Sequence, residues 1–151
     1  MQDIRAGLVE SLENPIGAKP LREEIPAGAR VALVVSDMSR FWMRQDLVIP
    51  HLVAYLHTAC GVPYERLTIV VANGTHLGGS EQELRTLVTD AVYDRVKVKN
   101  HDCEAKDLVY LGTTPHGTPV SIDRTAAEAD LVVCLGAVTH HVMAGFGGGR
   151  K

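Results

Sequence analysis

The sequence predicts an α/β fold, namely an open, mostly parallel sheet with helices on both faces, a Rossmann-like three-layer domain with a short edge hairpin. Two observations lead to this class. Hydrophobic residues make up 46% and charged residues 22% of the 151-residue chain, a composition typical of a globular domain with an apolar core. In addition, short β-branched apolar runs alternate with segments of helical periodicity, which is the pattern of successive βα units.

Three apolar runs are predicted to be the inner strands of the sheet. They are RVALVVS (30–36), LTIVVAN (67–73) and DLVVCLG (130–136), and each ends in polar or glycine residues. Near-continuous apolar runs of this length are typical of parallel strands that are buried on both faces.

Helices are predicted after the first and second strands. Apolar residues recur at helical spacing from Leu47 to Cys60, and Gly61 stands where a helix C-cap is expected. Ser80 and Glu83 form a capping-box pattern ahead of a second apolar helix face. The chain order is therefore predicted as βαβα.

The remaining segments are predicted to be short and peripheral. Residues 96–123 contain extended pieces, edge strands or a hairpin around a turn at 115–117, and residues 123–130 form a short helix that leads into the last strand. Residues 1–29 are predicted as an N-terminal helix and a linker packed on the domain. Residues 30–151 are predicted as the α/β domain itself.

Charge and cysteine content exclude several classes of protein. The net charge is −3 and no Lys/Arg run occurs, which disfavours a nucleic-acid partner. The three cysteines are far apart and form neither a disulfide framework nor a CxxC pair, as expected in a reducing cytoplasm. The first fifteen residues carry charges and lack the apolar stretch of a signal peptide or a membrane span, so no membrane association is expected.

Polar residues follow each predicted strand, at the edge of the sheet where ligands bind in open α/β folds. Asp37, Ser39 and Arg40 follow the first strand, His76 follows the second, and His141 follows the third. An arginine suits a carboxylate or phosphate ligand, and a histidine takes up and returns a proton near neutral pH. The alternatives are a helix N-cap with a solvated Arg40, and a surface position for His76.

The chain ends in AGFGGGRK (144–151), a glycine run next to two cations. Glycine lets the backbone approach a bound phosphate, so this run predicts a loop for an anionic nucleotide. It is neither a Walker A loop nor GxGxxG, because Arg150 occupies a position where each motif requires glycine. The alternative is a flexible tail, which would have no need for the apolar Phe146.

Five segments carry a resemblance to a known family when they are taken together. They are DMSR (37–40), NGTH (73–76), NHD (100–102), GTPVSID (117–123) and HVMAGFGGGRK (141–151). In this order and spacing they resemble the lactate racemase family, whose members are nickel-dependent enzymes that carry a nickel-pincer nucleotide. The resemblance covers nearly the whole chain but only the N-terminal part of a family member.

The resemblance implies a role for each candidate residue. Arg40 would contact the substrate carboxylate, and His76 and His141 would act as acid and base on the two faces of the substrate. Lys151 would carry the covalent link to the pincer, with Asp37 supporting the glycine loop. The residues implied to bind the cofactor are Lys151, Asp37, Ser39, Gly145, Phe146, Gly148 and Gly149. In the family, hydride moves from the 2-carbon of a 2-hydroxy acid to the cofactor and back.

The sequence also departs from the family pattern. Leu77 stands where a basic residue is expected and His140 where proline is expected, so a 2-hydroxy acid other than lactate is an open alternative for the substrate. The resemblance places the nickel-ligating histidine beyond Lys151, in a second domain. It therefore assigns no metal ligand to this chain, and the chain alone is expected to be inactive.

Two other functions stay open at this point. The same crevice is compatible with a non-catalytic phosphate- or nucleotide-binding module. A hydrolytic metal site built on His76, His101 and His141 ranks last, because no HxxxH or HxH spacing supports it.

Overall fold

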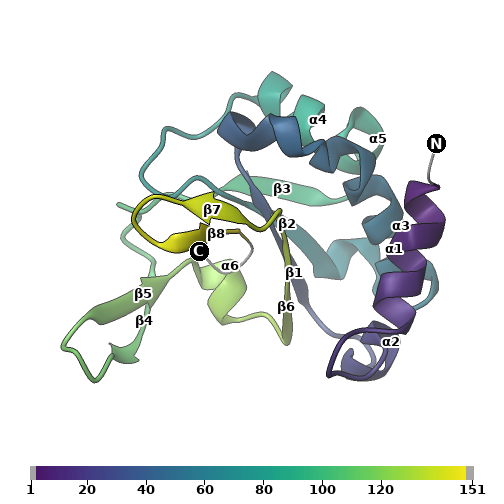
Figure 1. Ribbon diagram of the computed structural model, residues 1–151, viewed down its shortest axis with the longest axis horizontal. Helices are drawn as coiled ribbons and strands as arrows, with labels where there is room; N and C mark the ends of the chain where they lie inside the picture. The colour runs from purple at the N-terminus through teal and green to yellow at the C-terminus, as the bar shows by residue number, and fades with distance from the viewer. Residues whose placement is uncertain (1–2, 149–151) are drawn as a thin grey trace.

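A four-stranded parallel sheet forms the centre of the computed structural model, which describes residues 3–148 (Figure 1). The strands are β1 (Val31–Ser36), β2 (Leu67–Ala72), β3 (Lys97–Asn100) and β6 (Leu131–Leu135), in the spatial order β3-β2-β1-β6. The chain moves outward from β1 to β3 and then returns to the other side of β1. The strand order therefore reverses between β1 and β6, which makes this the topological switch point. The predicted α/β class is confirmed.

Helices surround this sheet, and most of them share its apolar core. They are α1 (Ile4–Glu13), α2 (Leu21–Glu24), α3 (Ile49–Thr58), α4 (Glu81–Val88), α5 (Asp90–Tyr93) and α6 (Arg124–Ala127), with the 3₁₀ helices η1 (Met38–Met43), η2 (Gln45–Leu47) and η3 (Tyr64–Arg66). Leu33 and Ile69 of the sheet are fully buried in one cluster with Leu56 of α3 and Leu87 of α4. α6 lies against β1 and β2 outside that cluster, as expected of a connection that returns past β1.

β6 is an edge strand that is only partly covered on one face. The prediction that it is buried on both faces is wrong, because Val132 is 41% exposed and Cys134 is also exposed. Leu131, Val133 and Leu135 point to the other face and pack against the core cluster. Within residues 3–148, the four-residue helix α6 is too short to cover the whole of the face of the sheet that carries Val132 and Cys134.

The predicted helix caps are present. Gly61 follows α3 with φ of 69°, a left-handed conformation that glycine adopts without strain. The Ser80 hydroxyl accepts a hydrogen bond from the backbone N–H of Glu83 at 3.3 Å, and the Glu83 carboxylate accepts one from the Ser80 N–H at 2.7 Å. This reciprocal pair confirms the capping box that begins α4.

The helix predicted to begin near Leu47 begins later. α3 starts at Ile49 with Pro50 in its first turn, where the missing N–H of proline is not needed. The preceding residues form η1 and η2 instead. They fold back on the end of β1, where the buried Gln45 amide donates to the Ser36 carbonyl at 2.6 Å and accepts from the Ser36 N–H at 3.3 Å.

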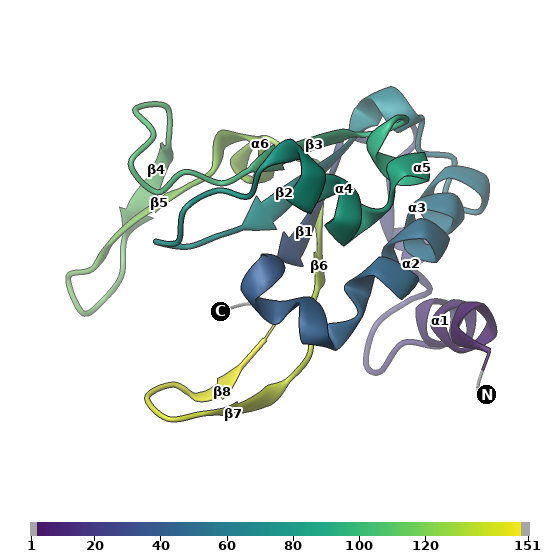
Figure 2. The same ribbon diagram turned by 90° about the horizontal axis from the view of Figure 1, so that it is seen from above.

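Two antiparallel hairpins lie outside the sheet. The first pairs β4 (Val109–Thr113) with β5 (Pro119–Ile122) and confirms the predicted hairpin, while β3 is the predicted edge strand. The second pairs β7 (Thr139–His141) with β8 (Gly145–Gly147), so the prediction of a glycine loop is wrong for the residues of β8. Figure 2 shows both hairpins projecting on the side of the molecule opposite α1.

The N-terminal helix packs against the body of the domain. Leu8 and Leu12 of α1 contact the core cluster, and the hydroxyl of Tyr55 on α3 donates to the Glu13 carboxylate at 2.7 Å. No helix among residues 3–148 combines the length and the apolar character needed to cross a membrane.

Candidate functional site

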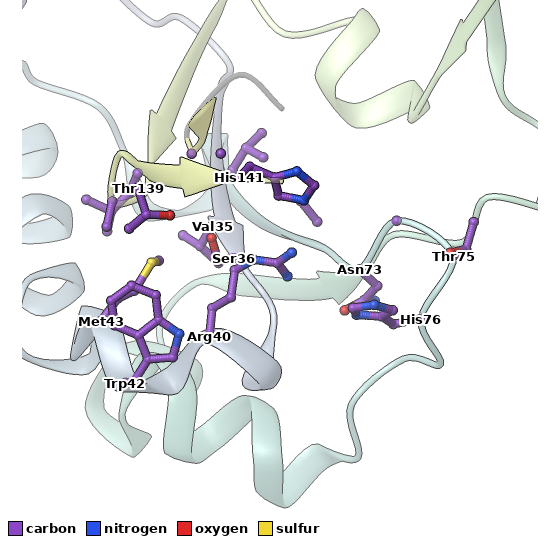
Figure 3. Close-up of a pocket in the computed structure, with 17 residues that line it drawn as sticks. Val35, Ser36, Arg40, Trp42, Met43, Asn73, Thr75, His76, Thr139 and His141 are labelled. Atoms are coloured by element: carbon purple, nitrogen blue, oxygen red, sulfur yellow. The ribbon is translucent and has the colours of Figure 1, made fainter. Parts of the chain in front are cut away.

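A cavity of about 420 Å³ opens at the carboxyl ends of β1, β2 and β6, beside the switch point (Figure 3). It is lined by Val34, Val35, Ser36, Arg40, Trp42, Met43, Ala72, Asn73, Gly74, Thr75, His76, Leu135, Ala137, Thr139, His141, Gly147 and Gly148. The site that the sequence predicts at the ends of the strands therefore coincides with a cavity. This is the usual ligand position in an open α/β sheet.

Arg40, His76 and His141 come from three different segments and meet at this cavity (Figure 3). η1 carries Arg40, the turn after β2 carries His76, and β7 carries His141. A hydrogen bond from the His76 N–H to the Asn73 carbonyl at 3.0 Å closes the turn after β2. The site thus contains one permanent cation and two groups that can exchange protons.

Asp37 connects the first two of these segments. Its Oδ1 accepts hydrogen bonds from the Ser39 hydroxyl at 2.7 Å and from Nη1 of Arg40 at 3.0 Å, and its Oδ2 lies 2.6 Å from Nδ1 of His76. Nη1 of Arg40 is also 3.2 Å from the Ser39 hydroxyl. Asp37 was predicted to support the glycine loop, but its hydrogen bonds among residues 3–148 go to Ser39, Arg40 and His76.

The environment of Asp37 favours its charged form. Burial raises the pKa of Asp37. The hydrogen bonds with Ser39 and His76 and the charge of Arg40 together lower it by more, so the net pKa lies below its ordinary value. A carboxylate that is 95% buried is stable only when it is paired, and here two neighbours and a cation pair with it.

A second cavity adjoins the first one and shares Asn73 and His76 with it. Its lining contains Asp37 and Ser39 together with the loop from Leu77 to Gly79 and the first turns of α4. Ser39 therefore lies beside the main cavity, and Asn73 and His76 belong to the walls of both spaces.

His141 is held by the turn between β7 and β8. Its Nδ1 accepts hydrogen bonds from the backbone N–H groups of Met143 and Ala144, both at 3.2 Å. The hairpin therefore fixes the ring and not only the backbone of this residue.

The glycine run contributes backbone to the cavity wall. Gly147 and Gly148 line the cavity, and a Cβ atom at Gly148 would lie 2.4 Å from the carbonyl oxygen of Ala137, so only glycine fits there. Gly145 and Phe146 do not line either cavity, and the exposed Phe146 ring lies 5.1 Å from the ring of His140. Gly149 and Lys151 lie outside the described residues.

Sequence reasoning missed a buried amide network beside His76. Nδ2 of Asn73 donates to Oδ1 of Asn100 and to the His101 carbonyl, both at 3.1 Å, and Asn100 bonds the backbone of Gly79 in both directions. These acceptors fix the orientation of the Asn73 amide. Its Oδ1 has no hydrogen-bond partner among the described residues. Asn73 and Asn100 begin two of the segments that carry the family resemblance, but no local pattern indicates that they bond each other.

Trp42 was also missed, although a signal for it exists. It is the only tryptophan of the chain, and it is 63% exposed where it lines the cavity. A large exposed aromatic beside a cavity is typical of a binding surface.

A metal centre is not assembled within residues 3–148, where no group of three His, Cys, Asp or Glu side chains could hold an ion. The hydrolytic metal site on His76, His101 and His141 therefore gains no support. His101 instead lies 3.7 Å from Asp123, at the end of β3.

The fold and the cavity define a parallel α/β protein with a partly polar cavity at its switch point. The chain belongs to the lactate racemase N-terminal domain family, whose sequence model matches residues 2–151. The resemblance drawn from the sequence motifs is confirmed.

Two curated relatives are lactate racemases. The one from Lactiplantibacillus plantarum is 31% identical over 143 residues, which are 94% of this chain and 33% of the relative. The one from Thermoanaerobacterium thermosaccharolyticum is 30% identical over 142 residues, 93% of this chain and 33% of the relative. The chain thus spans about a third of the length of the curated relatives that it matches.

Two solved structures share this fold. The lactate racemase apoprotein from Thermoanaerobacterium thermosaccharolyticum has a TM-score of 0.88 and 28% identity, over 99% of this chain and 35% of that one. A protein from Thermotoga maritima has a TM-score of 0.70 at 22% identity, over 95% of this chain and 34% of that one, and shares the fold.

Proposed function

We propose that this chain forms part of the active site of a nickel-pincer-nucleotide-dependent racemase or epimerase that acts on lactate or another 2-hydroxy acid. One observation carries the proposal. Arg40, His76 and His141, which lie far apart in the sequence, line one cavity in a chain of the lactate racemase N-terminal domain family.

Arg40 suits the carboxylate of the substrate. Its Nη1 is anchored on Asp37 and Ser39, while 42% of the side chain stays exposed at the cavity. A guanidinium has five N–H donors in a planar fork, so anchoring one nitrogen leaves other donors for a carboxylate ligand.

His76 and His141 suit the proton transfers. Racemisation requires removal of the hydroxyl proton from either enantiomer, with the hydrogen of the 2-carbon restored on the opposite face, and one base on one side does not serve both directions. Two histidines from separate segments meet this requirement, since both rings reach the same cavity.

The glycine-lined wall suits the close approach of a bound nucleotide, because Gly147 and Gly148 place backbone instead of side chains at the cavity. In the proposal Lys151 holds the nickel-pincer nucleotide covalently, and the residues around it are Asp37, Ser39, Gly145, Phe146, Gly148 and Gly149. When bound, this group would supply a hydride acceptor for the 2-carbon of the substrate. The nickel-ligating histidine is proposed to come from a second domain outside these 151 residues, which corresponds to the part of the relatives after the equivalent of Lys151.

Two positions that depart from the family pattern, Leu77 and His140, leave the choice among 2-hydroxy acids open. Leu77 is 96% exposed and lines the second cavity, and His140 stacks near Phe146 on the hairpin. We therefore propose a 2-hydroxy acid, with lactate as the first to test. The three free cysteines support a reducing cytoplasm as the site of action.

The test is racemisation by the protein that the complete gene encodes, loaded with nickel and the pincer nucleotide. Single enantiomers of lactate and other 2-hydroxy acids are supplied, and the opposite enantiomer is measured by chiral chromatography. His76→Ala and His141→Ala are each expected to lower kcat by about 10²-fold to 10⁴-fold, which is the usual contribution of a general acid or base.

His116→Ala is the matched control, because His116 lies in the exposed turn between β4 and β5, away from the cavity. Its activity should equal that of the unmodified protein. Binding of the nucleotide without turnover of any 2-hydroxy acid would contradict the proposal and favour a non-catalytic binding module. Peptide mass spectrometry of Lys151 then shows whether the cofactor was attached.

A further inference from the structure

The two histidines of the cavity are both held through Nδ1, but by partners of opposite kind. Nδ1 of His76 lies 2.6 Å from the Asp37 carboxylate, which is an acceptor. Nδ1 of His141 lies 3.2 Å from each of two backbone N–H groups, of Met143 and Ala144, which are donors. The partner of one ring nitrogen determines where the proton of a neutral imidazole resides.

For His76 the proton must lie on Nδ1. Asp37 accepts hydrogen bonds from Ser39 and Arg40 through its other oxygen, and its low exposure leaves little water to bond Oδ2. The carboxylate is ionised at neutral pH, so the short contact is a hydrogen bond that Nδ1–H of His76 donates to Oδ2. The lone pair of the neutral ring then lies on Nε2.

For His141 the proton must lie on Nε2. A backbone N–H group only donates, so Nδ1 of His141 has to present its lone pair to Met143 and Ala144. The neutral ring therefore carries its hydrogen on Nε2.

We propose that His76 and His141 are held as opposite tautomers, with Asp37 as the positioning residue that makes Nε2 of His76 a proton acceptor and the hairpin turn making Nε2 of His141 a hydrogen-bond donor. The proposal deepens the racemase function above and depends on it only for its catalytic meaning. The tautomers themselves are properties of the folded chain.

The consequence is that the two histidines are not interchangeable at the start of a turnover. When Nε2 of His76 removes the hydroxyl proton, the O–H bond breaks, an N–H bond forms, and the new positive charge lies next to the Asp37 carboxylate. His141 meanwhile donates a hydrogen bond from Nε2–H. For Nε2 of His141 to act as the base, the ring proton must first move from Nε2 to Nδ1. This requires the hydrogen bonds from the N–H groups of Met143 and Ala144 to Nδ1 to break.

The test is a long-range ¹H–¹⁵N correlation spectrum of the 151-residue chain with ¹⁵N-labelled histidine, at pH 8 and without cofactor or substrate. The two ring nitrogens of a neutral histidine differ strongly in ¹⁵N shift according to which one carries the proton. His76 is expected to show the Nδ1–H pattern and His141 the Nε2–H pattern.

His57 provides an internal control, because its Nδ1 lies 3.0 Å from the Val62 carbonyl and must therefore be protonated in every variant. Asp37→Ala is expected to move His76 from the Nδ1–H to the Nε2–H pattern while His57 and His141 keep theirs. Loss of the His57 pattern would show unfolding, in which case the spectrum of the unmodified chain alone decides.

A spectrum in which His76 and His141 show the same tautomer would overturn the inference, and so would an Nε2–H pattern for His76 in the unmodified chain. Neither outcome depends on racemase activity. Opposite tautomers in a protein that racemises no 2-hydroxy acid would uphold this inference and contradict the proposed function. Equal tautomers in a protein that does racemise one would contradict this inference and uphold the proposed function.

Discussion

Asp37 carries a buried negative charge that Ser39, Arg40 and His76 hold in place. Because these contacts exist only in the folded chain, the same carboxyl group binds protons more tightly after unfolding. A single residue thereby links the pH dependence of stability to the geometry of the candidate site.

Stability should decrease in acid in part through Asp37. Its pKa in the folded chain lies below the ordinary value of 3.8, so its stabilising contribution is complete above that value and is lost as the pH falls from 3.8 towards the lower folded pKa. Asp37→Asn removes the titration, and its free energy of unfolding should decrease less steeply in this range. Urea unfolding between pH 5 and pH 3 measures this, and equal slopes for both proteins would refute it.

Single residues also show what the sequence can and cannot reveal. Arg40, His76 and His141 were predicted because each follows an apolar strand, and the ends of parallel strands share one edge of the sheet. The contact between Asp37 and His76 spans 39 positions, and the amide network of Asn73 and Asn100 spans 27, so no local pattern indicates either one.

At the level of elements, η2 closes the end of β1. Gln45 satisfies both the N–H and the carbonyl of Ser36 and so replaces a neighbouring strand at the point where the polar segment of the site begins. The side chain is 97% buried, which leaves water little access to these two backbone groups once Gln45 is removed.

Gln45→Ala is therefore expected to lower the free energy of unfolding by about 1–3 kcal/mol, which is the usual effect of leaving a buried polar group without its partner. Urea denaturation measures this loss. Gln82→Ala, on the exposed face of α4, removes the same side chain at the surface and should change stability by less than about 0.5 kcal/mol. Equal effects at both positions would contradict this account of η2.

The accuracy of prediction also differs among elements. The core strands and the α4 capping box were predictable, because apolar runs and the Ser80–Glu83 pair are local signals. The pairing of β7 with β8 was not, because glycine has a low strand propensity and the pairing between Thr139 and Gly147 arises from the geometry of the turn. The start of α3 was missed because Leu47 and Val48 continue the apolar spacing of the helix although they precede it, Leu47 as the last residue of η2.

For the whole molecule, a hydrogen bond adds to the apolar contacts of Leu8 and Leu12 that join the N-terminal helix to the domain. The Tyr55 hydroxyl on α3 donates to Glu13 at the end of α1, and Arg22 forms an ion pair with the same carboxylate. Burial and then the neighbouring Glu13 raise the pKa of Tyr55 to about 12, so the phenol stays a donor throughout the neutral range.

Tyr55→Phe keeps the packed ring and removes only this donor, so the chain should lose about 1 kcal/mol of stability to unfolding. A double-mutant cycle with Glu13→Gln checks the cause. If the two groups act through their mutual bond, the combined loss is smaller than the sum of the single losses. Strict additivity would mean that α1 is held by its apolar contacts alone.

The β4–β5 hairpin lies outside the central sheet and the candidate site. It projects from the connection between β3 and β6, carries the exposed side chains of Tyr110 and Leu111, and lines neither cavity (Figure 2). Its tip therefore offers an attachment point for a fluorophore or an affinity handle, where a chemist can alter the polypeptide without touching the carboxylate and imidazoles at the heart of the molecule.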